Sequence, residues 1–191
     1  MSTFWQDPNL EPKRSYRFIL SIPGGAGGTG RGIREFLVKK VSKPNFTIST
    51  QPHKFLNHTF NYPGRIEWQA IDATIVDTVS TDANATQEIM SMLEQSGYEI
   101  PTNPAQGGGL GTISKRKAVT EGLGQVTIRT IDSDGNTVEE WILNNAFISK
   151  ATFGDLDYDA EAMLEATITL TYDNAYIDVV NGGGTFPATS S

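Results

Sequence analysis

The stretch Leu164-Glu-Ala-Thr-Ile-Thr-Leu-Thr-Tyr172 decides the fold class of this chain. Apolar or aromatic residues occupy every second position, and polar residues occupy the positions between them. A period of two places alternate side chains on opposite faces of a β-strand, so that one face is buried and the other is polar. The stretch therefore predicts a half-buried strand whose polar face consists of Glu165, Thr167, Thr169 and Thr171.

Most of the remaining chain also has β character. Further strands are expected at residues 16–22, 33–41, 46–50, 67–77, 125–131 and 137–148. The turn Asp132–Asn136 contains an Asp-Gly pair, which is a strong hairpin signal. One helix is expected at about residues 82–96, with Ser80, Thr81 or Asp82 as its N-cap. Many short strands, one helix and clear turns favour a β-barrel or sandwich.

A chain of 191 residues fits a single domain with a sizeable core. Residues 1–15 are polar and predict an N-terminal arm, residues 16–180 predict one β-domain, and the Gly- and Ser-rich residues 181–191 predict a flexible C-terminal tail. Two glycine-rich loops are expected at residues 23–32 and 101–111.

Charge is divided unequally between the two halves of the chain. Residues 1–66 contain ten Lys and Arg against three carboxylates, a balance of +7, whereas residues 67–191 contain five against nineteen, a balance of −14. A folded chain with a basic front and an acidic back is suited to binding copies of itself. The alternative is that the asymmetry is accidental and disperses over the folded surface.

Bulk composition excludes several classes of protein. The net charge of −7 argues against simple nucleic-acid binding, and the absence of cysteine excludes disulfide scaffolds and thiolate chemistry. The start of the sequence lacks the pattern of a secretory signal, and no apolar run approaches the ~20 residues of a membrane span. We therefore expect a protein that is made and folded in a cytoplasm.

Residues 51–65 predict a hairpin arm. This segment contains Phe55, Leu56, Phe60 and Tyr62 beside basic residues and histidines, and prolines bracket it. About seven residues per side, at ~3.3 Å each, would reach ~23 Å. An isolated two-stranded hairpin is marginal in water, so such an arm would need a partner surface. The alternative is that the segment packs on its own domain.

The one nucleotide-binding pattern is incomplete. Residues 25–30 read Gly-Ala-Gly-Gly-Thr-Gly and match G-x-G-x-x-G. A dinucleotide site also needs a helix at that point and an acidic residue ~20 positions further on. The next element is strand-like, and no carboxylate lies between Glu35 and Glu67. The pattern therefore does not predict a cofactor.

Metal and catalytic patterns are also incomplete. A calcium loop starting at Asp155 would have Ala160 and Ala166 where glycine and glutamate are required, so only weak calcium binding stays open there. His53 and His58 are five positions apart and do not form the i, i+4 pair of a zinc helix. We expect no catalytic residues, no metal and no cofactor, and hence no enzyme.

The order of these elements resembles the tail tube proteins of contractile-tailed bacteriophages over roughly residues 15–175. The similarity rests on the strand at 16–22, the segment 36–50 before the arm, the junction Tyr62-Pro-Gly-Arg-Ile-Glu-Trp68, the helix around 89–93, and the closing stretch 141–172 that includes Gly154-Asp-Leu-Asp-Tyr-Asp159. The two glycine-rich loops and the C-terminal tail look like additions to compact members of that family.

The resemblance implies a mainly β fold, with a six-stranded antiparallel barrel or sandwich, one flanking helix and an extended hairpin arm. It implies hexameric rings that stack head to tail into a hollow tube for DNA ejection into the host. The implied partners are further copies of the chain, the tail sheath protein, the tape-measure protein, and the baseplate hub and neck or terminator proteins. DNA would pass through without specific binding. The implied location is the tail tube of a myovirus virion, assembled in the host bacterial cytoplasm.

The resemblance also implies roles for three groups of residues. Inter-subunit contacts are expected from the arm residues Phe55, Leu56, His58, Phe60 and Tyr62. Ring-to-ring or tube-to-sheath contacts are expected from the basic residues Arg31, Arg34, Lys39, Lys40, Lys43 and Lys54. The lumen is expected to be lined by Glu165, Thr167, Thr169 and Thr171, a face that could equally point outward. An acidic or neutral lining would help DNA slide, because basic walls hold phosphates.

Two other functions stay open on the sequence. The inner tube of a phage-like contractile injection or type VI secretion system has the same implied fold but passes protein effectors. A lipocalin-like ligand-binding barrel would instead be a monomer with an apolar cavity.

Overall fold

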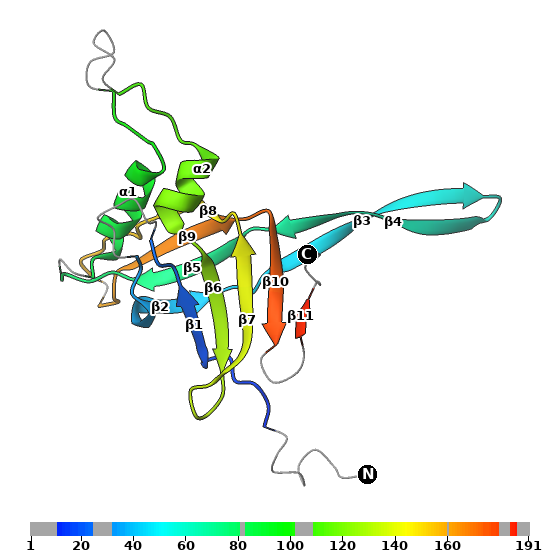
Figure 1. Cartoon of the computed structure of the whole chain (residues 1–191), viewed down its shortest axis with the longest axis horizontal. Helices are drawn as coiled ribbons and strands as arrows, with labels where there is room; N and C mark the ends of the chain where they lie inside the picture. Colours follow the sequence, from blue (N-terminus) through cyan, green and yellow to red (C-terminus); the bar gives the residue numbers. More distant parts are fainter. Residues whose placement is uncertain are drawn as a thin grey trace.

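The computed structural model describes residues 11–24, 32–80, 83–101, 109–159 and 161–179, together with the backbone of 184–186. Its strands form three antiparallel sheets. Two of these sheets build the body of the molecule, and the third is a long hairpin that projects from it (Figure 1).

The first sheet has the strand order β1-β6-β7-β10-β11. Its strands are β1 (Phe18–Ser21), β6 (Val126–Ile131), β7 (Thr137–Asn144), β10 (Asn174–Val179) and β11 (Gly184–Phe186). Alternation along these strands buries the side chains of Leu20, Val126, Ile128 and Leu143. The predicted turn at Asp132–Asn136 joins β6 to β7 as expected, and the Asp132 carboxylate accepts hydrogen bonds from the backbone N–H groups of Asp134 and Asn136.

The second sheet has the order β2-β5-β9-β8. Its strands are β2 (Val38–Val41), β5 (Ile71–Val76), β8 (Phe147–Thr152) and β9 (Glu165–Thr171). The alternation predicted for residues 164–172 is confirmed, because Ala166, Ile168 and Leu170 are buried and the residues between them are not. Apolar residues from the inner faces of both sheets form one core cluster, so the two sheets pack as a sandwich.

The third sheet is the hairpin of β3 (Asn45–Phe55) and β4 (His58–Gln69). Residues 51–65 do form an arm, but the hairpin is longer than predicted. Residues 46–50 and 67–69, which we expected as body strands, form its root. Periodicity identified these residues as strand but could not identify their partner. At the tip, Leu56 has a φ of 50°, an uncommon conformation for a bulky residue.

The long helix α1 (Ala85–Gln95) lies within the predicted range, but its N-cap is Asn84. The Asn84 side chain accepts a hydrogen bond of 2.8 Å from the backbone N–H of Gln87. Asp77, just after β5, also accepts from the N–H of Ala85 and from the hydroxyl of Thr86, at 2.9 and 2.6 Å. Burial raises the pKa of Asp77, but these hydrogen bonds outweigh burial and lower the pKa overall.

The expectation of a single helix is wrong. Residues 115–123 form a second helical segment, made of α2 (Lys115–Lys117) and η4 (Ala118–Leu123). It packs against α1, and a Cβ placed on Gly122 would come within 2.9 Å of the Ser96 hydroxyl oxygen. The three basic residues and the glycine of this stretch hid its periodicity. One turn of 3-10 helix, η2 (Glu35–Leu37), also replaces part of the strand expected at 33–41.

Two further expectations differ from the structure. The described strands form sheets of five, four and two strands, and none of these sheets closes into a six-stranded barrel. The reason is that β3 and β4 pair with each other and leave both body sheets. Within the tail expected to be flexible, residues 184–186 pair with β10 as β11. Most of the two glycine-rich loops and most of the N-terminal arm lie outside the described residues.

Candidate assembly surfaces

The five arm residues predicted to contact another subunit lie in the half of the hairpin farthest from the body (Figure 1). All five are exposed, and Leu56 at the tip is 87% exposed. Exposed apolar side chains gathered on one projecting element mark an interaction surface.

At a β-bulge halfway along the hairpin, the apolar residues change from one face of the hairpin to the other. The register shifts between Ile48 and Thr50 on β3, so that two residues of β4, Gly64 and Arg65, lie opposite Ser49. The apolar pairs nearer the body lie on one face, which we call the root face: Phe46, Ile48, Ile66 and Trp68. The aromatic residues beyond the bulge lie on the opposite face, which we call the distal face: His53, Phe55, His58, Phe60 and Tyr62.

Gly64 is required by the close approach at this bulge. A Cβ at position 64 would lie 2.3 Å from the Ser49 hydroxyl oxygen and 3.0 Å from its carbonyl oxygen. The Ser49 hydroxyl oxygen also accepts a hydrogen bond of 3.0 Å from the backbone N–H of Arg65. The small residue thus allows the bulge that separates the root face from the distal face.

The root face holds the hairpin to the body. The ring of Trp68 packs edge-on against Phe46 at a centroid distance of 5.4 Å, and it lies tilted against the ring of Tyr172 at 6.0 Å. Tyr172 is buried directly after β9, and burial raises the pKa of its hydroxyl. The direction in which the arm projects therefore depends on Tyr172, at the end of β9, the strand predicted from residues 164–172.

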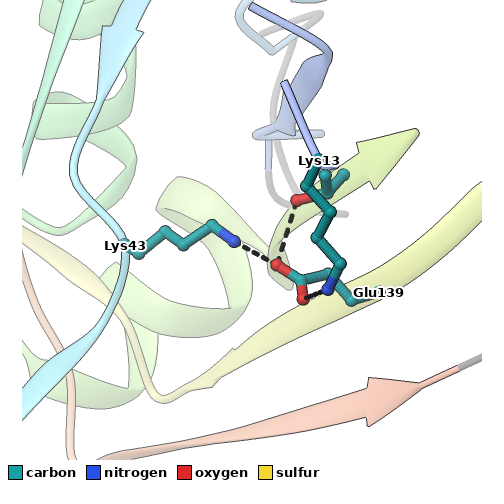
Figure 2. Close-up of polar contacts among 4 residues, drawn as sticks. Lys13, Lys43 and Glu139 are labelled. Atoms are coloured by element: carbon teal, nitrogen blue, oxygen red, sulfur yellow. Dashed lines mark hydrogen bonds and ion pairs between the residues drawn. The ribbon is translucent and has the colours of Figure 1, made fainter. Parts of the chain in front are cut away.

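A buried carboxylate also ties the root to the first sheet. Glu139 of β7 faces the core side, and the ammonium groups of Lys13 and Lys43 contact its two oxygens, as Figure 2 shows. The hydroxyl of Thr130 donates a third bond, of 3.1 Å. Burial raises the pKa of Glu139, but the two lysines outweigh it and lower the pKa from 4.5 to about 2. Lys43 precedes β3, so this cluster fixes the point where the arm begins.

The predicted basic contact surface is divided among several places. Lys43 pairs with Glu139, and Lys39 pairs with Glu165. Arg34 and Lys40 are exposed on the body, whereas Lys54 is exposed on the arm. Arg31 lies outside the described residues. The described members of this group therefore lie at several places on the body and the arm.

The predicted lumen residues Glu165, Thr167, Thr169 and Thr171 share the outer face of the second sheet. On this face the hydroxyl of Thr169 donates to Asp72 at 2.7 Å, and Thr167 lies 3.5 Å from Thr74. Strand register adds two basic residues, because Lys40 pairs with Thr74 and Lys150 pairs with Thr169. The face is therefore rich in threonine and mixed in charge.

The strands at the two sides of this sheet, β2 and β8, have no further strand partner among the described residues. Their outer N–H and C=O groups are available for pairing with another chain.

Two kinds of feature are absent from the part of the chain that the structure describes. In the described residues, no cluster of three or more His, Asp or Glu is placed to hold a metal ion. None of the described helices has the length and apolar character needed to cross a membrane.

Solved structures with the same fold come from contractile injection machines. One of them is a chain from the baseplate of the anti-feeding prophage. The match has a TM-score of 0.63 and 15% identity, and covers 90% of this chain and 98% of the other. The chain has a tail-tube-like fold. The resemblance inferred from the order of elements is thus confirmed at the level of fold.

Two structures of an extracellular contractile injection system, PVC, agree with this conclusion. The sheath/tube terminator has a TM-score of 0.60 and 19% identity, and covers 88% of this chain and 98% of the other. The sheath-tube complex has a TM-score of 0.56 and 20% identity, and covers 88% of this chain and 93% of the other. No protein-family model matches the chain, and no curated protein matches it.

Several residues that shape these surfaces were missed from the sequence. Glu139 occupies a core-facing position in phase with Trp141 and Leu143, and this phase is a signal that a buried carboxylate needs counter-charges. Lys13 and Lys43 could not be identified as those counter-charges, because they lie 126 and 96 residues away along the chain. In the sequence, Gly64 and Trp68 stand out only as part of the junction Tyr62–Trp68.

Proposed function

We propose that the chain is a structural subunit of a bacteriophage tail tube. In this proposal, six copies form a ring, and rings stack into a hollow conduit through which DNA is ejected into the host. The observation that carries the proposal is the four-stranded sheet with two open edges, β2 and β8, and a polar outer face. It is supported by the fold shared with parts of contractile injection machines.

Edge-to-edge pairing of this sheet would close a ring. If β2 of one copy pairs with β8 of the next, six copies place about 24 strands around a central channel. At ~4.8 Å between strands, the circumference is about 115 Å and the backbone diameter about 37 Å. The face of Glu165, Thr167, Thr169 and Thr171 would then line the lumen. Its mixed charge and many hydroxyls suit the passage of DNA without specific binding, because a strongly basic wall would hold phosphates.

The arm would contribute contacts between copies, and the sheath, tape-measure, baseplate hub and terminator proteins would be the other partners. A head-to-tail contact that does not close on itself produces a filament, so arm contacts between rings would extend the tube. Of the basic residues, Arg34 and Lys54 are the best suited to such contacts, because Lys39 and Lys43 are paired within the chain and Lys40 lies on the proposed lumen face.

The test is electron microscopy of the purified protein and of an armless variant. The variant replaces residues 51–62 with Asn-Gly, which joins the paired residues Thr50 and Pro63 through a two-residue turn. We expect six-fold rings or tubes from the wild type, and folded subunits without tubes from the variant, since the removed residues are exposed and lie outside the core. A wild type that stays monomeric at high concentration would refute the proposal.

A second candidate is the inner tube of a contractile injection or type VI secretion machine that passes protein effectors. The favouring observation is that the similar structures with TM-scores above 0.5 come from such machines. The proposed backbone diameter of about 37 Å does not separate the two cargoes, because a folded domain of 100 residues, with a radius of gyration of ~13 Å, has a comparable width. Capsid and terminase genes beside this gene would favour the phage tube, and effector genes would favour the injection tube.

A further inference from the structure

Among the described residues, none covers the distal face of the arm. Phe55, Phe60 and Tyr62 are 61%, 51% and 58% exposed, and Leu56 adds an apolar tip. Arg65 adds positive charge on this side at the bulge, Lys54 adds it near the tip from the other face of β3, and no carboxylate occurs from Phe36 to Ile66. The surface that fits this arm must be apolar and acidic.

The connection between β8 and β9 has that composition. Three of its apolar side chains are strongly exposed: Leu156 at 88%, Tyr158 at 109% and Met163 at 67%. Four carboxylates alternate with or follow them, and no basic residue lies between Phe153 and Glu165. We call this segment the acidic apolar loop and define it by Asp155, Leu156, Asp157, Tyr158, Asp159, Glu161 and Met163.

The arm and this loop cannot meet within one copy. The arm projects from one end of the body, whereas β9 begins, and the loop ends, at the opposite end of the longest axis (Figure 1). Complementary surfaces at opposite ends of one molecule favour contact between successive copies.

We propose that the distal face of the arm docks on the acidic apolar loop of a second copy. Aromatic residues of the arm would cover Leu156 and Tyr158. Lys54 lies next to Phe55 on the other face of β3, and its long side chain would reach round the edge of the strand to the carboxylates of the loop. The contact is heterologous, so each copy offers one arm and one loop, and the series does not close on a dimer. This inference rests on the proposed tube function and identifies the surface that receives the arm.

Cysteine pairing tests the contact directly, because the chain has no cysteine of its own. The variant Leu56→Cys/Leu156→Cys places one thiol on the arm tip and one on the loop. Under copper-phenanthroline oxidation of assembled protein, we expect a ladder of disulfide-linked oligomers on a non-reducing gel. Each single variant can give no species larger than a dimer.

A matched control places the second thiol elsewhere on the body. Ile113 is also apolar and exposed, at 56%, and lines a groove beside α1 and β8. We expect the variant Leu56→Cys/Ile113→Cys to give no ladder. A ladder from this control and none from the Leu156 variant would place the arm in the groove instead and would overturn the proposal.

Charge reversal supplies a second measurement. We expect Lys54→Glu alone and Asp157→Lys alone each to reduce tube yield at least tenfold, and the double reversal to restore most of it. A wild type that forms no rings or tubes would refute the tube function. Wild-type tubes combined with neither a ladder nor rescue would refute only this docking contact.

Discussion

The cluster around Glu139 gives the sharpest energetic prediction. Replacing Glu139 with Gln keeps the shape of the side chain but removes the charge that holds Lys13 and Lys43. The pKa of Glu139 is lowered from 4.5 to about 2, and each pKa unit corresponds to ~1.36 kcal/mol. Both lysine side chains are 53% exposed, so solvent screens part of this interaction. We therefore expect Glu139→Gln to reduce the free energy of unfolding by about 2 to 3 kcal/mol at pH 7.

The dependence on pH identifies the cause. A carboxylate whose pKa is lowered on folding stabilises the protein above its unfolded pKa, and this stabilisation is lost as the pH falls through the folded pKa. The difference between wild type and variant should therefore stay constant from pH 7 to pH 5 and then shrink between pH 4.5 and about 2. Both proteins need to be compared as unassembled subunits, because assembly adds stability by mass action.

The assay is urea unfolding followed by circular dichroism at a series of pH values. The control is Glu140→Gln, on the opposite face of β7, which we expect to change stability by less than ~0.5 kcal/mol. A difference for Glu139→Gln that does not change between pH 5 and pH 2 would show that packing, and not charge, is responsible, and would refute the reasoning.

Two further predictions concern local contacts. Asp77→Ala removes hydrogen-bond acceptors from the first turn of α1, so it should reduce the free energy of unfolding by ~1–2 kcal/mol at pH 7, measured by urea unfolding. Because the pKa of Asp77 is lowered on folding, this loss should diminish as the pH falls below 3.8. A loss that does not change with pH would contradict the prediction. Gly64→Val would bring a side chain into contact with Ser49 at the bulge. We expect this variant to have a normal circular dichroism spectrum but to form at least tenfold fewer tubes by electron microscopy. The control Asn61→Val, on the same strand, should assemble normally.

The sequence predicted the elements whose signals are local. Alternation in residues 164–172 identified β9 and its two faces, and the Asp-Gly turn identified the β6–β7 hairpin. Apolar residues in a segment bracketed by prolines identified the arm. These signals succeed because side-chain period and turn chemistry depend on neighbours within a few residues.

Tertiary structure decided everything that depends on which segments meet. Residues 46–50 have the period of a body strand, yet they pair with β4 and lengthen the arm. Glu139 receives its counter-charges from lysines about a hundred residues away, and a bulge at Gly64 determines which way the aromatic residues of the arm face. A local pattern fixes the face on which a side chain lies along its strand. Only long-range pairing fixes what that face meets, because pairing depends on the packing of the whole chain.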